Sequence, residues 1–393
     1  MKLNWPLMHN NITKDDRKAL ISFLQNDEIL TQSKNVAALE KEWSEWLGVK
    51  YSIFVNSGAS ANLLTMQVIN ILFGAGDIIV PAITWVSDIA SVIQNGHKPV
   101  FVDVNPKTLA MAYDSVCDAI TKKTRAVFLT HLLGLNGLND RLLKKLDRYN
   151  IPLIEDCCES HGATFKGKKL GTYGLISNFS FYYAHHMTTI EGGMICTNDE
   201  NIYDTVRMLR SHGLVREAHS LTTKTYYQNK YQDLRSDFIF AYPAYNVRST
   251  ELNAVMGRSQ LKRLDSNNEK RRNNFATFLY HLDPDKYETE LDTKGSVSYA
   301  FILILKKASS ASPKNVEATL KEHGVEFRAG LSGGGNQMRQ PYYRDYLTKV
   351  RRINSYDKLP VAEYLHFNSW YIGNYPDLEQ EKIRQLCVIL NRL

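Results

Sequence analysis

Two adjacent histidines, His185 and His186, lie in a polar segment between two stretches with strand patterns. The preceding run, Asn178–Tyr183, is aromatic and alternating, and Met194–Thr197 follows a Gly-Gly turn as a returning strand. Imidazole can bind a metal or act as a general base near neutral pH. Metal binding is disfavoured, because adjacent side chains on an extended segment point opposite ways and no third ligand is suitably spaced. Taken alone, both histidines could also be ordinary polar loop residues.

Further candidate residues follow the ends of other predicted strands. Stretches 51–55, 78–81, 99–104, 126–130 and 152–156 have strand patterns and alternate with helical stretches. This alternation predicts an α/β fold with a mostly parallel sheet, in which ligands bind beyond the carboxyl ends of the strands. The residues at those ends are Ser57, Gly58, Trp85, Asp156, Glu159, Ser180 and His185. Their convergence predicts a ligand site at this edge of the sheet.

One of these strand ends has the form of an anion-binding turn. The strand 51–55 leads through Ser57 and Gly58 into a helix that is predicted to begin at Ala59. Free backbone N–H groups and the helix dipole favour an anion such as phosphate there. Ser-Gly turns are common, so the motif is weak by itself, and Trp85 could stack on a flat ligand or belong to the core.

Length and composition indicate a globular protein of two domains. A chain of 393 residues is too long to fold around one hydrophobic core. We therefore expect a large domain over 1–264 and a small α+β domain over 265–393. The net charge of +7 is spread out, without a basic block interleaved with aromatics, so an acidic substrate is favoured over nucleic acid. No run approaches 18 apolar residues and no signal-like start is present, which predicts a cytoplasmic protein without membrane contact. The five cysteines lack disulfide or zinc spacing, and no metal is expected.

Four motifs in order resemble the nucleotide-sugar aminotransferase family of fold-type I pyridoxal-phosphate enzymes. They are the phosphate turn VNSGAS, the cofactor-ring strand IEDCCESHG, the catalytic strand SFYYAHHMTTIEGG and the dimer-contact helix YNVRSTELNAVMG. The resemblance runs from residue 29 to residue 257 and more weakly to the end. It implies a mostly parallel sheet sandwiched by helices, a smaller C-terminal domain, and a homodimer with its active site at the subunit interface.

The resemblance also assigns roles to individual residues. Asp156 would pair with the protonated pyridine nitrogen of the cofactor and keep the ring an electron sink, while Trp85 would stack on the ring. Glu159 would lie beside the ring hydroxyl, where most relatives carry Gln, and one of those two partners must then be protonated. The residues implied to hold the cofactor phosphate are Ser57, Gly58, Ala59 and Ser180, with Asn246 reaching across the dimer.

The sequence departs from the family at the catalytic lysine. Counting on from Ser180 and back from Glu191 places that position on His185. A lysine amine forms a Schiff base with pyridoxal phosphate, whereas imidazole has no primary amine. The resemblance therefore implies noncovalently bound pyridoxamine phosphate, with His185 as the base. An inactive relative is the alternative, and the retention of Asp156, Glu159 and Ser180 argues against it.

A histidine at this position is similar to the sugar 3-dehydratases of the family. That similarity implies removal of the C3 hydroxyl from a 4-keto nucleotide sugar, with glutamate regenerating the amine form of the cofactor. A branch acting on CDP-sugars holds an iron–sulfur cluster with four clustered cysteines, whereas only Cys157 and Cys158 adjoin here. The segments SGGGNQMRQPY and YIGNYP instead resemble the branch that acts on GDP-4-keto-6-deoxymannose for the colitose of lipopolysaccharide O-antigen.

The substrate site is the least defined part of this prediction. His212 is expected near the sugar, although it could merely cap its helix. The candidates for substrate binding are Arg248, Arg328, Asn336 and Arg339, and the arginines suit diphosphate oxygens unless they are surface charges. An ordinary sugar aminotransferase, a CDP-sugar 3-dehydratase and a non-catalytic relative stay as alternative functions.

Overall fold

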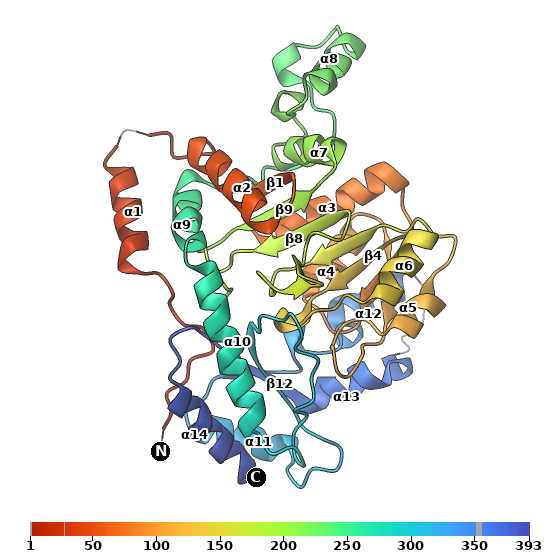
Figure 1. Ribbon diagram of the computed structural model, residues 1–393. Coiled ribbons are helices and arrows are strands. Elements are labelled where there is room, and N and C mark those ends of the chain that lie inside the picture. The colour runs from red at the N-terminus through yellow and green to blue at the C-terminus, as the bar shows by residue number, and fades with distance from the viewer. Residues whose placement is uncertain (1, 27, 351–355) are drawn as a thin grey trace.

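The computed structural model describes residues 2–26, 28–350 and 356–393 and shows two sheets (Figure 1). The larger sheet has the order β1-β9-β8-β5-β4-β2-β3, and within it only β9 runs against its neighbours. Its strands are β1 Tyr51–Val55, β2 Asp77–Pro81, β3 Lys98–Val102, β4 Thr124–Thr130, β5 Leu153–Asp156, β8 Ile176–Ser180 and β9 Gly193–Thr197. The predicted mostly parallel sheet is therefore confirmed.

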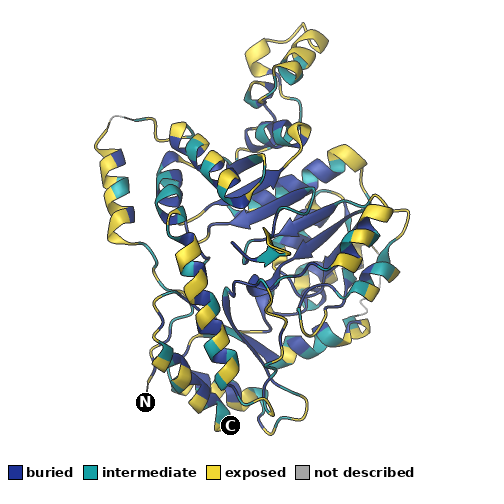
Figure 2. Ribbon diagram, viewed as in Figure 1, coloured by how far each residue is buried: buried dark blue, intermediate teal, exposed yellow. Residues whose placement is uncertain are grey.

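The larger sheet is buried on both faces, as its dark-blue strands in Figure 2 show. Successive residues point to opposite faces of a strand. Ile79 and Val127 accordingly belong to one apolar cluster, whereas Ile78 and Phe128 belong to the cluster on the other face. Helices must therefore cover both faces. They are α2 Lys34–Leu47, α3 Gly58–Phe73, α4 Val86–Gln94, α5 Tyr113–Ala119, α6 Asp140–Arg148, α7 Glu200–Arg210 and α9 Glu251–Leu261.

Helix starts follow the capping residues in the sequence. Thr13 and Asp16 form a reciprocal capping box at α1, Lys14–Leu24. Thr250 caps α9 by accepting from the backbone N–H of Asn253. These caps determine the residue at which each helix begins, because they satisfy backbone N–H groups of its first turn.

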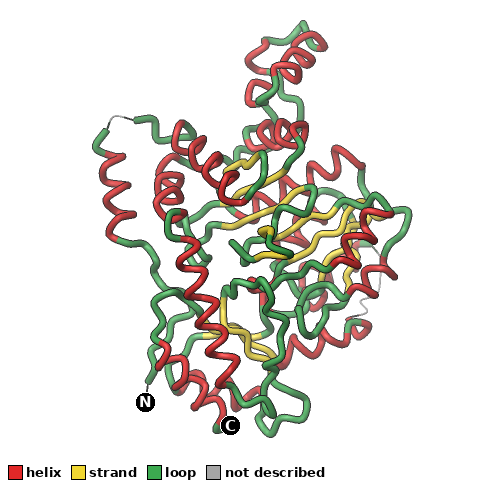
Figure 3. The backbone as a smooth tube through the Cα atoms, in the orientation of Figure 1, coloured by secondary structure: helices red, strands yellow, loops and turns green. Residues whose placement is uncertain are grey.

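The smaller sheet is formed by strands that follow the long helix α10, Leu264–His281, in the chain (Figure 3). Its strands β10, β12 and β11 are antiparallel and span Ala300–Ile304, Ser369–Gly373 and Phe327–Ala329. The helices around it are α11 Pro313–Glu322, α12 Pro341–Lys349, α13 Pro360–Asn368 and α14 Gln380–Asn391. The sequence had not indicated β12, α12 or α13. The apolar strand β12 lies between the other two, so its burial depends on partners far away in the chain.

The N-terminal segment packs against the smaller sheet. The indole N–H of Trp5 donates to the carbonyl of Gly373 at 2.8 Å, and its ring lies 5.8 Å from that of Phe301. The first residues thus join the core of a region that the sequence assigned to 265–393. The boundary at 264 stays a prediction, and residues 351–355 of the second predicted domain lie outside the described residues.

A projecting segment interrupts the order of strands and helices. Helix α8, Leu221–Lys230, extends away from the body of the molecule and contributes no buried residue (Figure 1). It lies within residues 220–245, a stretch rich in Tyr, Gln and Asn. Within the ranges described above, no helix is long and apolar enough to cross a bilayer.

Candidate active site

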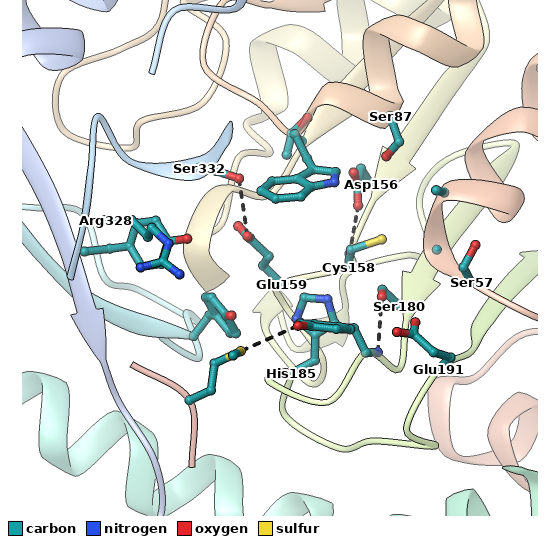
Figure 4. Close-up of a pocket in the computed structure, with 18 of the residues that line it drawn as sticks. Ser57, Ser87, Asp156, Cys158, Glu159, Ser180, His185, Glu191, Arg328 and Ser332 are labelled. Carbon is teal, nitrogen blue, oxygen red and sulfur yellow. Dashed lines mark hydrogen bonds between the residues drawn. The ribbon is translucent and has the colours of Figure 1, made fainter. Parts of the chain in front are cut away.

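A cavity of ≈ 340 Å³ opens at the carboxyl ends of β5 and β8 (Figure 4). It is lined by predicted residues from separate segments, namely Ser57, Gly58, Ala59, Trp85, Asp156, Glu159, Ser180, His185 and Arg328. Parallel strands deliver their carboxyl ends to one edge, which is why residues so distant in the sequence meet here. The predicted convergence on one site is therefore what the structure shows.

One end of the cavity is formed by the start of α3. The Ser57 side chain caps this helix by accepting from the backbone N–H of Ser60 at 3.0 Å. A Cβ atom on Gly58 would lie 2.6 Å from the Cβ of Ser180, so a glycine is required for α3 to approach β8. The first N–H groups of a helix have no intrahelical acceptor. This end of the cavity therefore suits an anion.

The floor of the cavity carries a buried carboxyl group. Asp156 ends β5, is only 3% exposed, and accepts from the backbone N–H of Cys158 at 2.8 Å. Trp85 precedes α4 and also lines the cavity, while its side chain is half exposed. A carboxylate at the floor and an anion site at the wall can together hold a ligand with a cationic ring and a phosphate.

Glu159 is held between two hydrogen-bond donors. The backbone N–H of Leu133 donates to it at 2.9 Å and the Ser332 hydroxyl at 3.3 Å. Burial, followed by the nearby Asp156, raises the pKa of Glu159 to about 7. The Glu159 carboxyl is therefore protonated at mildly acidic pH. This agrees with the expectation that either this glutamate or the ring hydroxyl beside it carries a proton.

His185 lies beside these carboxyl groups and its ring extends into the cavity between Glu159 and Ser180 (Figure 4). Burial, followed by the charge of Arg271, lowers the pKa of His185 to about 3. The imidazole is therefore neutral near pH 7. Its ring lies 5.3 Å from that of Tyr299, which lines the same cavity.

The neighbouring histidine has a different environment. A ring nitrogen of His186 lies 3.0 Å from the carbonyl of Val297, and the side chain is buried outside the residues that line the cavity. Burial lowers the pKa of His186 well below its usual range. The two adjacent histidines thus diverge, as expected for an extended segment, and only His185 lines the cavity.

Three predicted residues, His212, Asn246 and Arg248, are not among the residues that line this cavity. The backbone N–H of His212 donates to the carbonyl of Tyr245 at 3.1 Å, and Ser211 pairs with Asn246 as an isolated β-bridge. His212 and Asn246 are exposed, and the Asn246 side chain accepts from the backbone N–H of Arg248 at 3.1 Å. Their roles at an active site, including one across a dimer, stay predictions.

Two further candidates are engaged elsewhere. The Arg339 guanidinium pairs with Glu363 at 2.5 Å and lies over the rings of Tyr356 and Phe367. Asn336 is buried and donates to the same Glu363 carboxylate at 2.6 Å. Neither lines the cavity, and both bind Glu363 on α13, so their roles as substrate ligands stay predictions. Arg328, on β11, does line the cavity and is exposed.

Several residues that line the cavity were not found from the sequence. They are Tyr182, Tyr299, Tyr371 and Ser332, with Thr130 at the end of β4. Tyr371 lies in β12 of the smaller sheet and Tyr299 directly precedes β10, and the placement of this sheet against the larger one is a tertiary feature. A tyrosine in or beside a strand pattern carries no signal of its own, because such a tyrosine usually packs in a core.

A second buried group of polar residues has a structural explanation. A ring nitrogen of His131 lies 3.1 Å from the Glu155 carboxylate, and Cys157 lies close to both. Glu155 also accepts from the backbone N–H groups of Gly171, Tyr173 and Gly174. These bonds occupy the carboxylate and tie β5 to the following turn. They hold the strand whose last residue is Asp156.

Known proteins of similar sequence and structure identify the family. Residues 10–391 match the model of the DegT/DnrJ/EryC1/StrS aminotransferase family. The chain is 32% identical over 401 residues to the GDP-4-keto-6-deoxy-D-mannose 3-dehydratase of Yersinia pseudotuberculosis, covering 99% of each chain. It is 31% identical over 384 residues to the GDP-perosamine synthase of Vibrio cholerae, covering 97% of each.

Solved structures give the same result. The E. coli GDP-4-keto-6-deoxy-D-mannose-3-dehydratase with bound hydrated PLP superposes with a TM-score of 0.89 at 31% identity, covering 99% of this chain and 100% of that one. A mutant GDP-4-keto-6-deoxymannose-3-dehydratase with bound GDP-perosamine gives 0.88 at 30% identity, covering 98% and 100%. The predicted fold-type I architecture is thereby confirmed. The chain belongs to the DegT/DnrJ/EryC1/StrS aminotransferase family.

Proposed function

We propose that this protein is a lyase that removes the C3 hydroxyl of GDP-4-keto-6-deoxymannose, using noncovalently bound pyridoxamine phosphate. The observation that carries the proposal is a histidine, His185, beside Asp156 and Glu159 in the cavity, where none of the described lining residues is a lysine. An enzyme that installs amino groups through this cofactor needs a lysine amine there. The relatives named 3-dehydratases support the same activity.

The residues of the cavity fit this cofactor. Asp156 provides a buried carboxylate for a protonated pyridine nitrogen, and the start of α3 with Ser180 provides N–H and hydroxyl donors for a phosphate. The close approach of Gly58 to Ser180 leaves no room for a Cβ atom at the phosphate end. Trp85 can cover the ring, and Glu159 can share a proton with the ring hydroxyl.

The chain's own groups then have distinct tasks. When bound, the cofactor supplies an amine that condenses with the C4 ketone and a ring that accepts electrons. His185, neutral near pH 7, accepts a proton from the methylene carbon next to that amine and returns one to the departing C3 hydroxyl. Asp156 keeps the ring nitrogen protonated. Tyr299, just before β10, and Tyr371, on β12, enclose the sugar and limit the access of water.

The nucleotide is assigned to a groove that adjoins the cavity. This groove has a volume of ≈ 410 Å³ and shares Trp85, Arg328 and Tyr371 with the cavity. Gly333 and Gly334 line it, so backbone can approach a ligand closely there. Arg328 is its cationic side chain and suits a diphosphate oxygen. A GDP-sugar can therefore bind with its sugar over the cofactor in the cavity and its guanine base in the adjoining groove.

A homodimer completes the proposal. The projecting segment 221–245 exposes seven large apolar side chains, namely Leu221, Tyr226, Tyr231, Leu234, Phe238, Phe240 and Tyr245. Such a concentration on one segment is typical of a protein interface. A second copy that covers this segment would bring Asn246 to the phosphate end of its partner's cavity, and glutamate would enter the same site as the amino donor.

The decisive experiment supplies purified protein with pyridoxamine phosphate, glutamate and either GDP- or CDP-4-keto-6-deoxyhexose. We expect ammonia, 2-oxoglutarate and a 3-deoxy sugar from the GDP substrate. Transfer of the amino group to the sugar without free ammonia would make the protein an aminotransferase instead. Turnover of the CDP substrate alone would overturn the choice of nucleotide.

A further inference from the structure

A second carboxyl group lies directly behind Asp156. Asp88, in the first turn of α4, is fully buried and accepts from the hydroxyl of Thr130, which lies opposite Asp156 in the register of β4 and β5. The Asp88 and Asp156 side chains also interact with each other. Two carboxylates in contact repel each other, and burial in a medium of low dielectric strengthens that repulsion. A buried pair of this kind is stable when the two groups share one proton.

The remaining partners of Asp88 are neutral. It accepts from the Asn62 amide at 2.6 Å, from the Thr130 hydroxyl at 2.9 Å, and from the Thr84 hydroxyl. The titratable groups that face it are Asp156 on β5, Cys158 just beyond that strand, and Tyr342 on α12. None of these groups is a cation, and no Lys or Arg of the described chain forms an ion pair or hydrogen bond with Asp88.

The neutral partners are themselves fixed. The Asn178 amide donates to Asn62 at 2.9 Å, and the Thr65 hydroxyl donates to Asn178 at 2.8 Å. These bonds link α3, α4 and β8 beneath the floor of the cavity. Asp88 therefore cannot turn away from Asp156 without leaving buried donors unpaired.

We infer that Asp88 is a positioning residue, which keeps its proton and donates it to the Asp156 carboxylate, so that the pair presents one negative charge to a pyridine nitrogen. The part that concerns the nitrogen rests on the proposed cofactor, whereas the acid–carboxylate pair belongs to the protein alone. One oxygen of Asp156 accepts from the Cys158 N–H, and the bond from Asp88 fixes the carboxylate plane. Burial, followed by the charge of Asp156, raises the pKa of Asp88 well above its usual range.

The first test is the pH dependence of unfolding in cofactor-free protein. A folded-state pKa above the unfolded one means that stability is lost as pH rises above the ordinary carboxyl value. Relative to Asp88→Asn, the unfolding constant of the wild type should therefore rise about tenfold per pH unit above pH ~4. Asp118→Asn, at an exposed position on α5, is the control and should follow the wild type. A difference between wild type and Asp88→Asn that does not vary with pH would overturn the inference.

Infrared spectra provide a second readout without any ligand. At pH 8 the wild type should show the C=O stretch of a buried carboxylic acid, and Asp88→Asn should lack it. Absence of this band from the wild type would mean that both groups are ionised and would also overturn the inference.

Binding of pyridoxamine phosphate tests the link to the ring. Asp88→Asn keeps an N–H donor for Asp156 and should bind within about threefold of the wild type, whereas Asp88→Leu should bind at least about tenfold more weakly. Equal binding by Asp88→Leu would remove the positioning role. If neither the wild type nor any variant binds pyridoxamine phosphate, the proposed function is wrong. The two ligand-free tests still show whether Asp88 and Asp156 share a proton.

Discussion

Gly58 and Ser180 approach so closely that a Cβ atom on the glycine would lie 2.6 Å from the Cβ of the serine. Gly58 begins α3 and Ser180 ends β8, so this contact sets the width of the proposed phosphate site.

Replacing Gly58 with alanine should push α3 away from β8. We expect a loss of about 1–3 kcal/mol in the free energy of unfolding and at least about tenfold weaker binding of pyridoxamine phosphate. Chemical denaturation and equilibrium binding measure these effects. Ser180→Gly removes the opposing Cβ, so the double variant should recover part of the unfolding free energy. Additive losses in the double variant would show that the contact is not the cause.

Replacing His185 with lysine should place an amine beside the cofactor. The variant should become covalently linked to pyridoxal phosphate after borohydride reduction, and dehydration should cease. His185→Asn is the comparison, because it removes the base without adding an amine, and its turnover should fall by about 10²–10⁴ with cofactor binding retained. Continued dehydration by the lysine variant would contradict the role of His185.

Glu159 gives the cofactor-free protein a pH-dependent stability. Its pKa of about 7 in the folded protein lies above the ordinary value of 4.5, so its contribution is fully present below pH ~4.5 and is lost as pH rises through ~7. Relative to Glu159→Gln, the wild type should therefore lose on the order of 2–3 kcal/mol between pH ~4.5 and pH ~8. Urea unfolding at a series of pH values measures this. If the difference in unfolding free energy between the wild type and Glu159→Gln does not change with pH, this prediction is wrong.

Arg328 and Arg339 should behave differently when replaced with alanine. Arg328 lines both the cavity and the adjoining groove, so Arg328→Ala should raise KM for the nucleotide sugar about tenfold with little change in kcat. Arg339 pairs with Glu363, so Arg339→Ala should lower the melting temperature and leave KM near that of the wild type. Steady-state kinetics and thermal unfolding separate the two, and a shared effect on KM would return Arg339 to the substrate site.

Asn246 should act in the partner subunit's site. Neither His185→Asn nor Asn246→Ala should be active alone, because each homodimer has two incomplete sites. Mixed after joint refolding, the two variants should regain about a quarter of the wild-type activity, since half the dimers would contain one complete site. Activity of Asn246→Ala by itself, or an inactive mixture, would contradict an active site shared between subunits.

The sequence by itself determined much of the larger sheet and which of the two adjacent histidines, His185, lines the cavity. Strands such as β1 and β5 are short apolar runs bounded by turns, and their alternation with helices requires a parallel arrangement. The order of motifs placed His185, Asp156 and Ser180 at strand ends, because this information is local. The caps at Thr13 and Thr250 are equally local, because each threonine bonds to a residue three positions further along the chain.

Only the tertiary structure decided which groups face one another. Arg339 and Arg328 have the same charge and neighbouring positions in the chain, but Glu363 on α13 engages the first and leaves the second at the cavity. Tyr299 enters the site because the smaller sheet packs against the larger one. Asp88 acquires its neighbour Asp156 only when α4 and β5 meet beneath the cavity. Side-chain pairing across distant segments depends on packing, and no spacing along the chain encodes it.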